Sequence, residues 1–158
     1  MVILNVIFRW TIVLGSVIFP ELCLSQLNIM SFQQVEEKQI IEPKNIIVFI
    51  YTDWCKYCKL MENTTFRNKE IIEKLNQESY FIRLNAEEKN DILFAGKTFH
   101  YKPTGTNTGV HELAEELGTI RGKLSYPTLV ILNSNNEIIF QYNGYLKTSE
   151  FFKFINEK

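Results

Sequence analysis

The feature of this sequence that most constrains the fold is a pair of cysteines directly after an apolar run. Cys55 and Cys58 are separated by two residues, and residues 46–51 before them are all apolar, β-branched or aromatic. Such a run predicts a strand that is buried on both faces. Residues 59–62, after the pair, are of types that favour a helix. The cysteines are therefore expected where a buried strand turns into a helix.

This position has a chemical consequence for the first cysteine. Free backbone N–H groups and the helix dipole at a helix N-terminus stabilise an anion, so we expect the pKa of Cys55 to be lowered. A lysine ammonium at Lys56 would favour the thiolate further. In thiol–disulfide exchange one thiolate attacks and a second thiol releases the product, and we assign these roles to Cys55 and Cys58. A structural disulfide that closes a small loop is the alternative for such a pair.

Two short motifs resemble those of a known family. Trp54 precedes the first cysteine, and Tyr126-Pro127-Thr128 leads into another apolar run far downstream. Together these motifs resemble the thioredoxin superfamily. Over roughly residues 30–158 the chain looks closest to secreted bacterial thioredoxin-like thiol:disulfide interchange proteins. The resemblance implies an α/β fold, a three-layer sandwich in which helices flank a central mixed β-sheet.

The resemblance also implies the roles of several residues. The bond between Tyr126 and Pro127 would be cis, and this loop would lie against the cysteines and present the substrate peptide. Trp54 and Gly144 would contact the substrate as well. No diffusible cofactor is implied, because electrons pass between the cysteines and a partner protein.

The sequence departs from the family at two places. The family's buried aspartate, six residues before the first cysteine, is replaced by Phe49. Either a water molecule, Asp53 or Glu62 takes the proton of the resolving thiol, or exchange is slower. The residues between the cysteines are Lys-Tyr, where thioredoxin has Gly-Pro. This second departure leaves the reduction potential and the direction of electron flow open, and we favour the reducing direction.

Periodicity and turn residues predict the remaining elements. We expect helices at 32–41, from the cysteines to about 63, at 68–77, at 111–117 with Gly118 as the C-terminal stop, and at 148–156. The β-branched residues at 64–65 predict a kink between the second and the third of these helices. We expect strands at 46–51, 80–84, 128–132 and 137–142, the last two forming a hairpin. Residues 86–109 contain dense turn signals and are expected to form an ordered insertion, in part a β-hairpin, that could select partners.

The first 25 residues differ in composition from the rest. They are mostly apolar, with a continuous block at 10–19 that follows Arg9. This pattern predicts a secretory signal peptide cleaved after Ser25, and an uncleaved membrane anchor is the alternative. Cleavage would remove Cys23 and leave a domain of residues 26–158 with the Cys55 and Cys58 pair alone. Export to the periplasm or the extracellular space is the expected location, where disulfides persist.

The composition narrows the function. The 17 basic and 18 acidic residues give a net charge of −1, which offers no excess positive charge for nucleic acid. We expect an exported thiol:disulfide oxidoreductase whose partners are protein thiols and disulfides and an upstream redox protein, with membrane contact only if residues 1–25 are retained. One alternative is a copper-handling protein that uses the cysteines with His100 or His111, although their spacing does not predict a metal site. The other is a redox-inert binding module.

Overall fold

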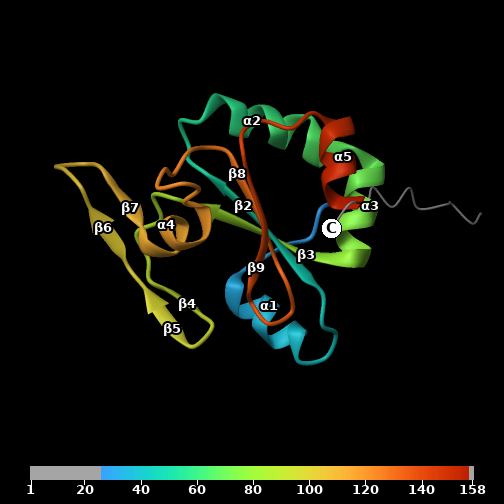
Figure 1. Ribbon diagram of the computed structural model, residues 1–158, viewed down its shortest axis with the longest axis horizontal. Helices are drawn as coiled ribbons and strands as arrows, with labels where there is room; N and C mark the ends of the chain where they lie inside the picture. Colours follow the sequence, from blue (N-terminus) through green and yellow to red (C-terminus); the bar gives the residue numbers. More distant parts are fainter. Residues whose placement is uncertain (1–25, 157–158) are drawn as a thin grey trace, which may run out of the picture.

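A five-stranded mixed sheet forms the centre of the computed structural model, which describes residues 26–156 (Figure 1). The strand order is β1-β3-β2-β8-β9. β1, β3 and β2 run parallel, while β8 and β9 are antiparallel to their neighbours. The strands are β1 (Ile29–Met30), β2 (Asn45–Tyr51), β3 (Ser79–Asn85), β8 (Thr128–Leu132) and β9 (Ile138–Asn143).

The central strand β2 shows why the sheet is covered on both faces. Its side chains alternate between two hydrophobic cores, with Val48 and Ile50 in one and Ile47 and Phe49 in the other. All four are buried, as expected for a strand with neighbours on both sides and helices on both faces. The α/β three-layer arrangement is therefore confirmed.

The two cores belong to different helices. Side chains of α1 and α4 pack into the core of Val48, whereas those of α2, α3 and α5 pack into the core of Phe49. A 3-10 turn, η1, joins α2 to α3 and produces the expected kink. The helices are α1 (Phe32–Gln39), α2 (Lys56–Asn63), η1 (Thr65–Arg67), α3 (Lys69–Glu78), α4 (Glu112–Gly118) and α5 (Thr148–Asn156).

Helix α1 ends two residues earlier than predicted, at Gln39. The Gln39 side chain donates to the carbonyl of Lys44 and accepts from its N–H, which closes a turn around the end of the helix. Ile40 and Ile41 are consequently 85% and 86% exposed instead of packing inward. The short strand β1 just before this helix was not predicted.

Gly118 does not act as the predicted stop signal. It is the last residue of α4, Thr119 caps the helix, and Gly118 is not among the residues with positive φ. A Cβ atom at Gly118 would lie 2.7 Å from Leu124 Cδ1 and 2.8 Å from Ile50 Cδ1. A larger residue would therefore need the ends of these two side chains to shift, so glycine fits best where the helix lies close against them.

The predicted insertion consists of two β-hairpins, one more than expected, and extends to residue 111. Figure 1 shows both hairpins projecting from the side of the sheet that carries α4. Phe94 and Phe99 anchor the first hairpin in the core of Val48. The hairpins pair β4 (Ile92–Phe94) with β5 (Lys97–Phe99) and β6 (Tyr101–Pro103) with β7 (Gly109–His111).

The predicted signal segment, residues 1–25, lies outside the described residues, so its cleavage or retention stays a prediction. Within residues 26–156, no helix is both long enough and apolar enough to cross a membrane.

Candidate active site

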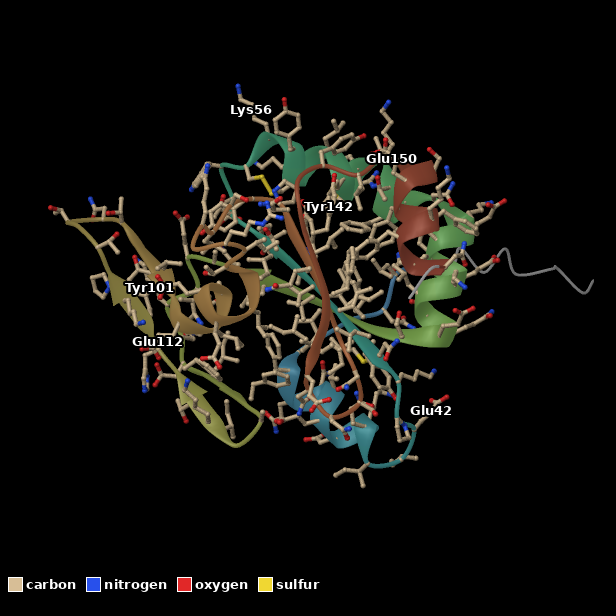
Figure 2. The ribbon with its side chains drawn as sticks, in the orientation of Figure 1. Glu42, Lys56, Tyr101, Glu112, Tyr142 and Glu150 are labelled. Carbon is tan, nitrogen blue, oxygen red and sulfur yellow. A yellow bond between two sulfur atoms is a disulfide. The ribbon has the colours of Figure 1, made fainter. Side chains whose placement is uncertain are left out.

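The two predicted cysteines form a disulfide at the start of α2 (Figure 2). The sulfur–sulfur distance is 2.02 Å. Cys55 is the N-cap residue, and its Sγ accepts a hydrogen bond from the N–H of Cys58 at 3.1 Å. Cys55 is 5% exposed and Cys58 is fully buried. An incoming sulfur can therefore reach Cys55 more readily than Cys58, in agreement with the attacking and resolving roles.

A sulfur at an N-cap position is well placed to become an anion. A hydrogen bond to a helix N–H stabilises the charged form of an acceptor, and the helix dipole adds to this effect. The lowered pKa of Cys55 in the reduced protein stays a prediction, since a disulfide sulfur does not titrate. Lys56 is exposed and points away from the body of the protein (Figure 2), so its tuning role also stays a prediction.

Trp54 and Tyr126 lie together beside the disulfide. Their rings meet edge to face with centroids 5.8 Å apart. Trp54 is 65% exposed, and its Nε1–H donates to Glu87 Oε1 at 3.0 Å. Burial raises the pKa of Tyr126 to about 12, and the carboxylates of Glu87 and Glu115 act in the same direction. The phenol of Tyr126 is therefore neutral at any pH where the protein would work.

The loop of Pro127 contacts the loop that follows β9. The bond between Tyr126 and Pro127 is cis, as the resemblance implied. The Pro127 carbonyl accepts a hydrogen bond from the N–H of Gly144 at 2.8 Å. Gly144 has a φ of 125°, which side chains other than glycine rarely adopt. These two predicted site residues are thus brought together in space, although 17 positions separate them in the sequence.

No carboxylate occupies the position of the family's buried acid. Phe49 is fully buried and stacks on Tyr51, with ring centroids 5.9 Å apart. The two replacements considered from the sequence have other partners: Glu62 pairs with Arg83, and Asp53 accepts a hydrogen bond from Asn85. Neither is hydrogen-bonded to a cysteine.

Sequence reasoning missed several residues at this site. Tyr57, between the cysteines, is 63% exposed, and its ring centroid lies 6.2 Å from that of Tyr145. Leu60, one turn further along α2, is also exposed. The position of Tyr57 inside the motif could have identified it, whereas nothing in the sequence signals the contact of Glu87 with Trp54.

Neither histidine lies in a metal-binding cluster. His100 is exposed and bonds to Asp91 at 2.8 Å. His111 is fully buried, its Nδ1 accepts from the N–H of Leu113, and its Nε2–H donates to the carbonyl of Asn90. Within residues 26–156, no three histidine, cysteine or acidic side chains are grouped to hold a metal ion.

Comparisons with known proteins agree with this architecture. A profile of the thioredoxin-like domain family matches residues 32–158. A sequence comparison with curated proteins gives no match.

Among solved structures, a DsbH oxidoreductase superposes with a TM-score of 0.61 at 14% identity, covering 88% of each chain. A putative disulphide-isomerase from Bacteroides thetaiotaomicron gives 0.58 at 20% identity, covering 84% of this chain and 92% of its own. A thioredoxin from Thermus thermophilus gives 0.58 at 15% identity, covering 84% and 86%. At these identities the likeness concerns the fold.

Proposed function

Because the chain belongs to the thioredoxin-like family, we propose that it reduces disulfides of other exported proteins through Cys55 and Cys58. The observation that carries this proposal is the Cys55–Cys58 disulfide at the N-terminus of α2, beside the cis peptide bond of Pro127. A family fold alone does not assign an activity. The proposal rests on the two sulfur atoms and on the groups around them.

The reaction consists of two exchange steps. In the reduced protein, the Cys55 thiolate attacks one sulfur of a substrate disulfide, a mixed disulfide forms, and the first substrate thiolate leaves and takes up a proton. Cys58 then loses its proton and attacks Cys55 Sγ, which forms the intramolecular disulfide and releases the second substrate thiolate. The substrate gains two electrons and two protons, and an upstream dithiol protein must restore the reduced state.

The surroundings support this division of roles. Cys58 follows Cys55 by one helical turn and is shielded from solvent, so it meets the mixed disulfide before an external thiol does. Trp54 directly precedes Cys55 and contacts Tyr126, which packs against the core that contains both cysteines. Export is supported by the sequence of residues 1–25, and detection of the chain in an exported fraction, with N-terminal sequencing to locate the cut, would test it.

The test of the activity is a trapping experiment with a reduction-potential measurement. The Cys58→Ser variant should accumulate mixed disulfides with substrate proteins, whereas Cys55→Ser should form none. Equilibration with glutathione buffers should give a potential near about −270 mV for a reductant, and a value near about −120 mV would instead indicate an oxidant. Failure of the pair to cycle at any glutathione ratio would overturn the proposal.

A further inference from the structure

We infer that partner proteins dock through an acidic segment with an aromatic anchor, bound in a groove between α5 and the kink that joins α2 to α3. This inference rests on the proposed function and specifies its partner. The groove has a volume of about 610 Å³. Thr64 and Asn68 line one wall, at the kink between α2 and α3, and Tyr145 and Phe152 line the other. We call this feature the α5 groove.

The groove is continuous with the reactive sulfur through exposed aromatic surface. Tyr57 lies between the two cysteines and contacts Tyr145, which lines the groove. Leu60 extends this surface along α2 and is 43% exposed. Exposed apolar side chains that adjoin a concave surface indicate a binding site. A segment whose cysteine reaches Cys55 can therefore place an aromatic side chain in the groove.

The walls of the groove are fixed relative to each other by a buried hydrogen bond. The Thr65 hydroxyl, at the kink, donates to the carbonyl of Leu146 at 2.9 Å. Thr65 is fully buried and Leu146 nearly so. The groove is thus formed before any partner arrives, which lowers the entropic cost of binding.

The charge around the groove is positive. Lys147 and Lys153 line it together with Glu70, and the exposed Lys56 and Lys59 lie on α2, between the disulfide and the kink. Glu150 accepts a hydrogen bond from the N–H of Lys147. Within residues 26–156, the ammonium groups of Lys56, Lys59 and Lys147 have no carboxylate within ion-pair distance. Unpaired lysines around an apolar groove attract a segment that carries both aromatic and acidic residues.

The opposite side of the disulfide has the opposite character. Glu87 accepts from Trp54, and Glu115 lies near Tyr126. Lys97 and Lys102 on the insertion are already paired with glutamates of α4. Figure 2 shows Lys56 above α2, far from Tyr101 and Glu112 on the insertion side. An acidic segment is therefore directed toward α2 and α5 and away from the insertion.

The test uses three synthetic peptides of equal length. Each contains one cysteine, blocked as a mixed disulfide with neutral 2-mercaptoethanol, and one phenylalanine, flanked by two glutamates, two glutamines or two lysines. The reduced protein should react with the acidic peptide roughly tenfold faster than with the basic one at low ionic strength. Because exposed charges are screened over about 10 Å at 0.1 M salt, this ratio should shrink as salt is added.

Charge reversal locates the effect. The double variant Lys59→Glu, Lys147→Glu should invert the order of the acidic and basic peptides. The matched control is the double variant Lys38→Glu, Lys89→Glu, at two exposed lysines on α1 and on the insertion. It changes the net charge by the same amount and should keep the wild-type order. Equal rates for the three peptides, or a preference that the double variant keeps, would overturn the inference.

A second measurement separates this inference from the proposed function. Peptides with serine in place of cysteine are titrated into the oxidised protein and followed by fluorescence anisotropy, so that no exchange is needed. The acidic peptide should bind about tenfold more tightly than the basic one. If hydroxyethyl disulfide is reduced but the affinities are equal, the groove inference fails and the enzymatic proposal stands. If the acidic peptide binds more tightly but hydroxyethyl disulfide is not reduced, the groove inference stands and the enzymatic proposal fails.

Discussion

The face of the sheet that carries the disulfide and the face that carries the insertion are held together by different interactions. On the disulfide face, the ring of Phe66 lies 4.9 Å from Phe49, 5.0 Å from Phe81 and 5.4 Å from Phe151, measured between centroids. Cys55 and Cys58 belong to this same core. Buried aromatic contacts carry no charge, so this cluster of rings should respond little to pH or salt. A charged contact on the same side of the sheet is the partly buried pair of Glu62 and Arg83.

On the insertion face, polar contacts supplement an apolar core of similar size. His111 links β7, α4 and the loop of Asn90, and lysines of both hairpins pair with α4. Glu87, at the start of the insertion, also holds Trp54. The comparison teaches that the sulfur atoms are positioned by packing, whereas the aromatic residue beside them is held by a polar contact that solution conditions can change.

The largest expected effect is on the disulfide face. Phe66→Ala should lower the free energy of unfolding by about 3–5 kcal/mol, because it removes a buried ring and leaves a cavity among three others. Chemical denaturation of the oxidised protein at several salt concentrations would measure it. A loss that depends strongly on salt would contradict the view that packing dominates this face.

The next largest effect is on the insertion face. His111→Ala should cost about 2–3 kcal/mol, because it removes a helix cap and leaves the carbonyl of Asn90 without its donor. Amide hydrogen exchange should show faster opening of β6, β7 and α4 than of α2. Equal acceleration in both regions would show that the two faces do not unfold independently.

The same histidine predicts a pH dependence. Burial lowers the pKa of His111, and this outweighs the opposing influence of the Asn90 hydrogen bond and of the carboxylates of Glu88, Glu112 and Asp91. The unfolded chain then binds more protons than the folded one below about pH 6.5, so stability should fall as the pH drops from 6.5 toward the lower folded pKa.

The other histidine provides an internal control with the opposite sign. The hydrogen bond to Asp91 raises the pKa of His100. Its small contribution to the stability of the folded state is therefore present at low pH and is lost as the pH rises. The chain has two histidines. His111→Asn should flatten the acid-side slope of stability, and His100→Asn should steepen it slightly. An unchanged slope in His111→Asn would exclude the buried imidazole as its origin.

Gly118→Ala gives a smaller effect that tests packing beneath the insertion. Alanine favours a helix over glycine by about 1 kcal/mol, but here its Cβ would press on Leu124 and Ile50. We expect a net loss of about 1–2 kcal/mol, measured by thermal unfolding. Stabilisation would mean that Leu124 moves aside without cost.

The smallest effect concerns a surface ion pair. Glu116→Gln removes the ion pair with Lys97, in which both side chains are more than half exposed, and keeps the contact of Lys97 with the Phe99 ring. Such pairs contribute about 0–1 kcal/mol and weaken with salt. The change in unfolding free energy should be below about 0.5 kcal/mol and should vanish at 1 M salt. A larger change would mean that ion pairs contribute more to the stability of the hairpins than we expect.

The central elements could be predicted because local patterns determine them. The apolar run of β2 and the residues after Cys58 specify a strand and a helix by composition alone, and the kink at Thr64 and Thr65 follows from β-branched residues. The positions of Trp54 and Pro127 near the cysteines, and the cis bond before Pro127, were predicted from the family's motifs and not from local patterns.

The insertion could not be predicted to the same degree, because long-range contacts determine it. The imidazole of His111 donates a hydrogen bond to the carbonyl of Asn90, which lies 21 positions earlier in the sequence. Glu87 reaches Trp54 across 33 positions. The role of Gly118 depends on Ile50 of another element. β1 has only two residues and exists because β3 offers a free edge. Periodicity within a window cannot detect such partners.

The buried bond between Thr65 and Leu146 has a consequence for how such a protein can diversify. It fixes the separation of the two groove walls from inside the core, while the lysines on those walls project into solvent. Exchanging these outer side chains need not disturb the framework, since surface substitutions usually change stability by less than about 0.5 kcal/mol. Client selectivity could therefore be redesigned, or drift in evolution, independently of the redox centre.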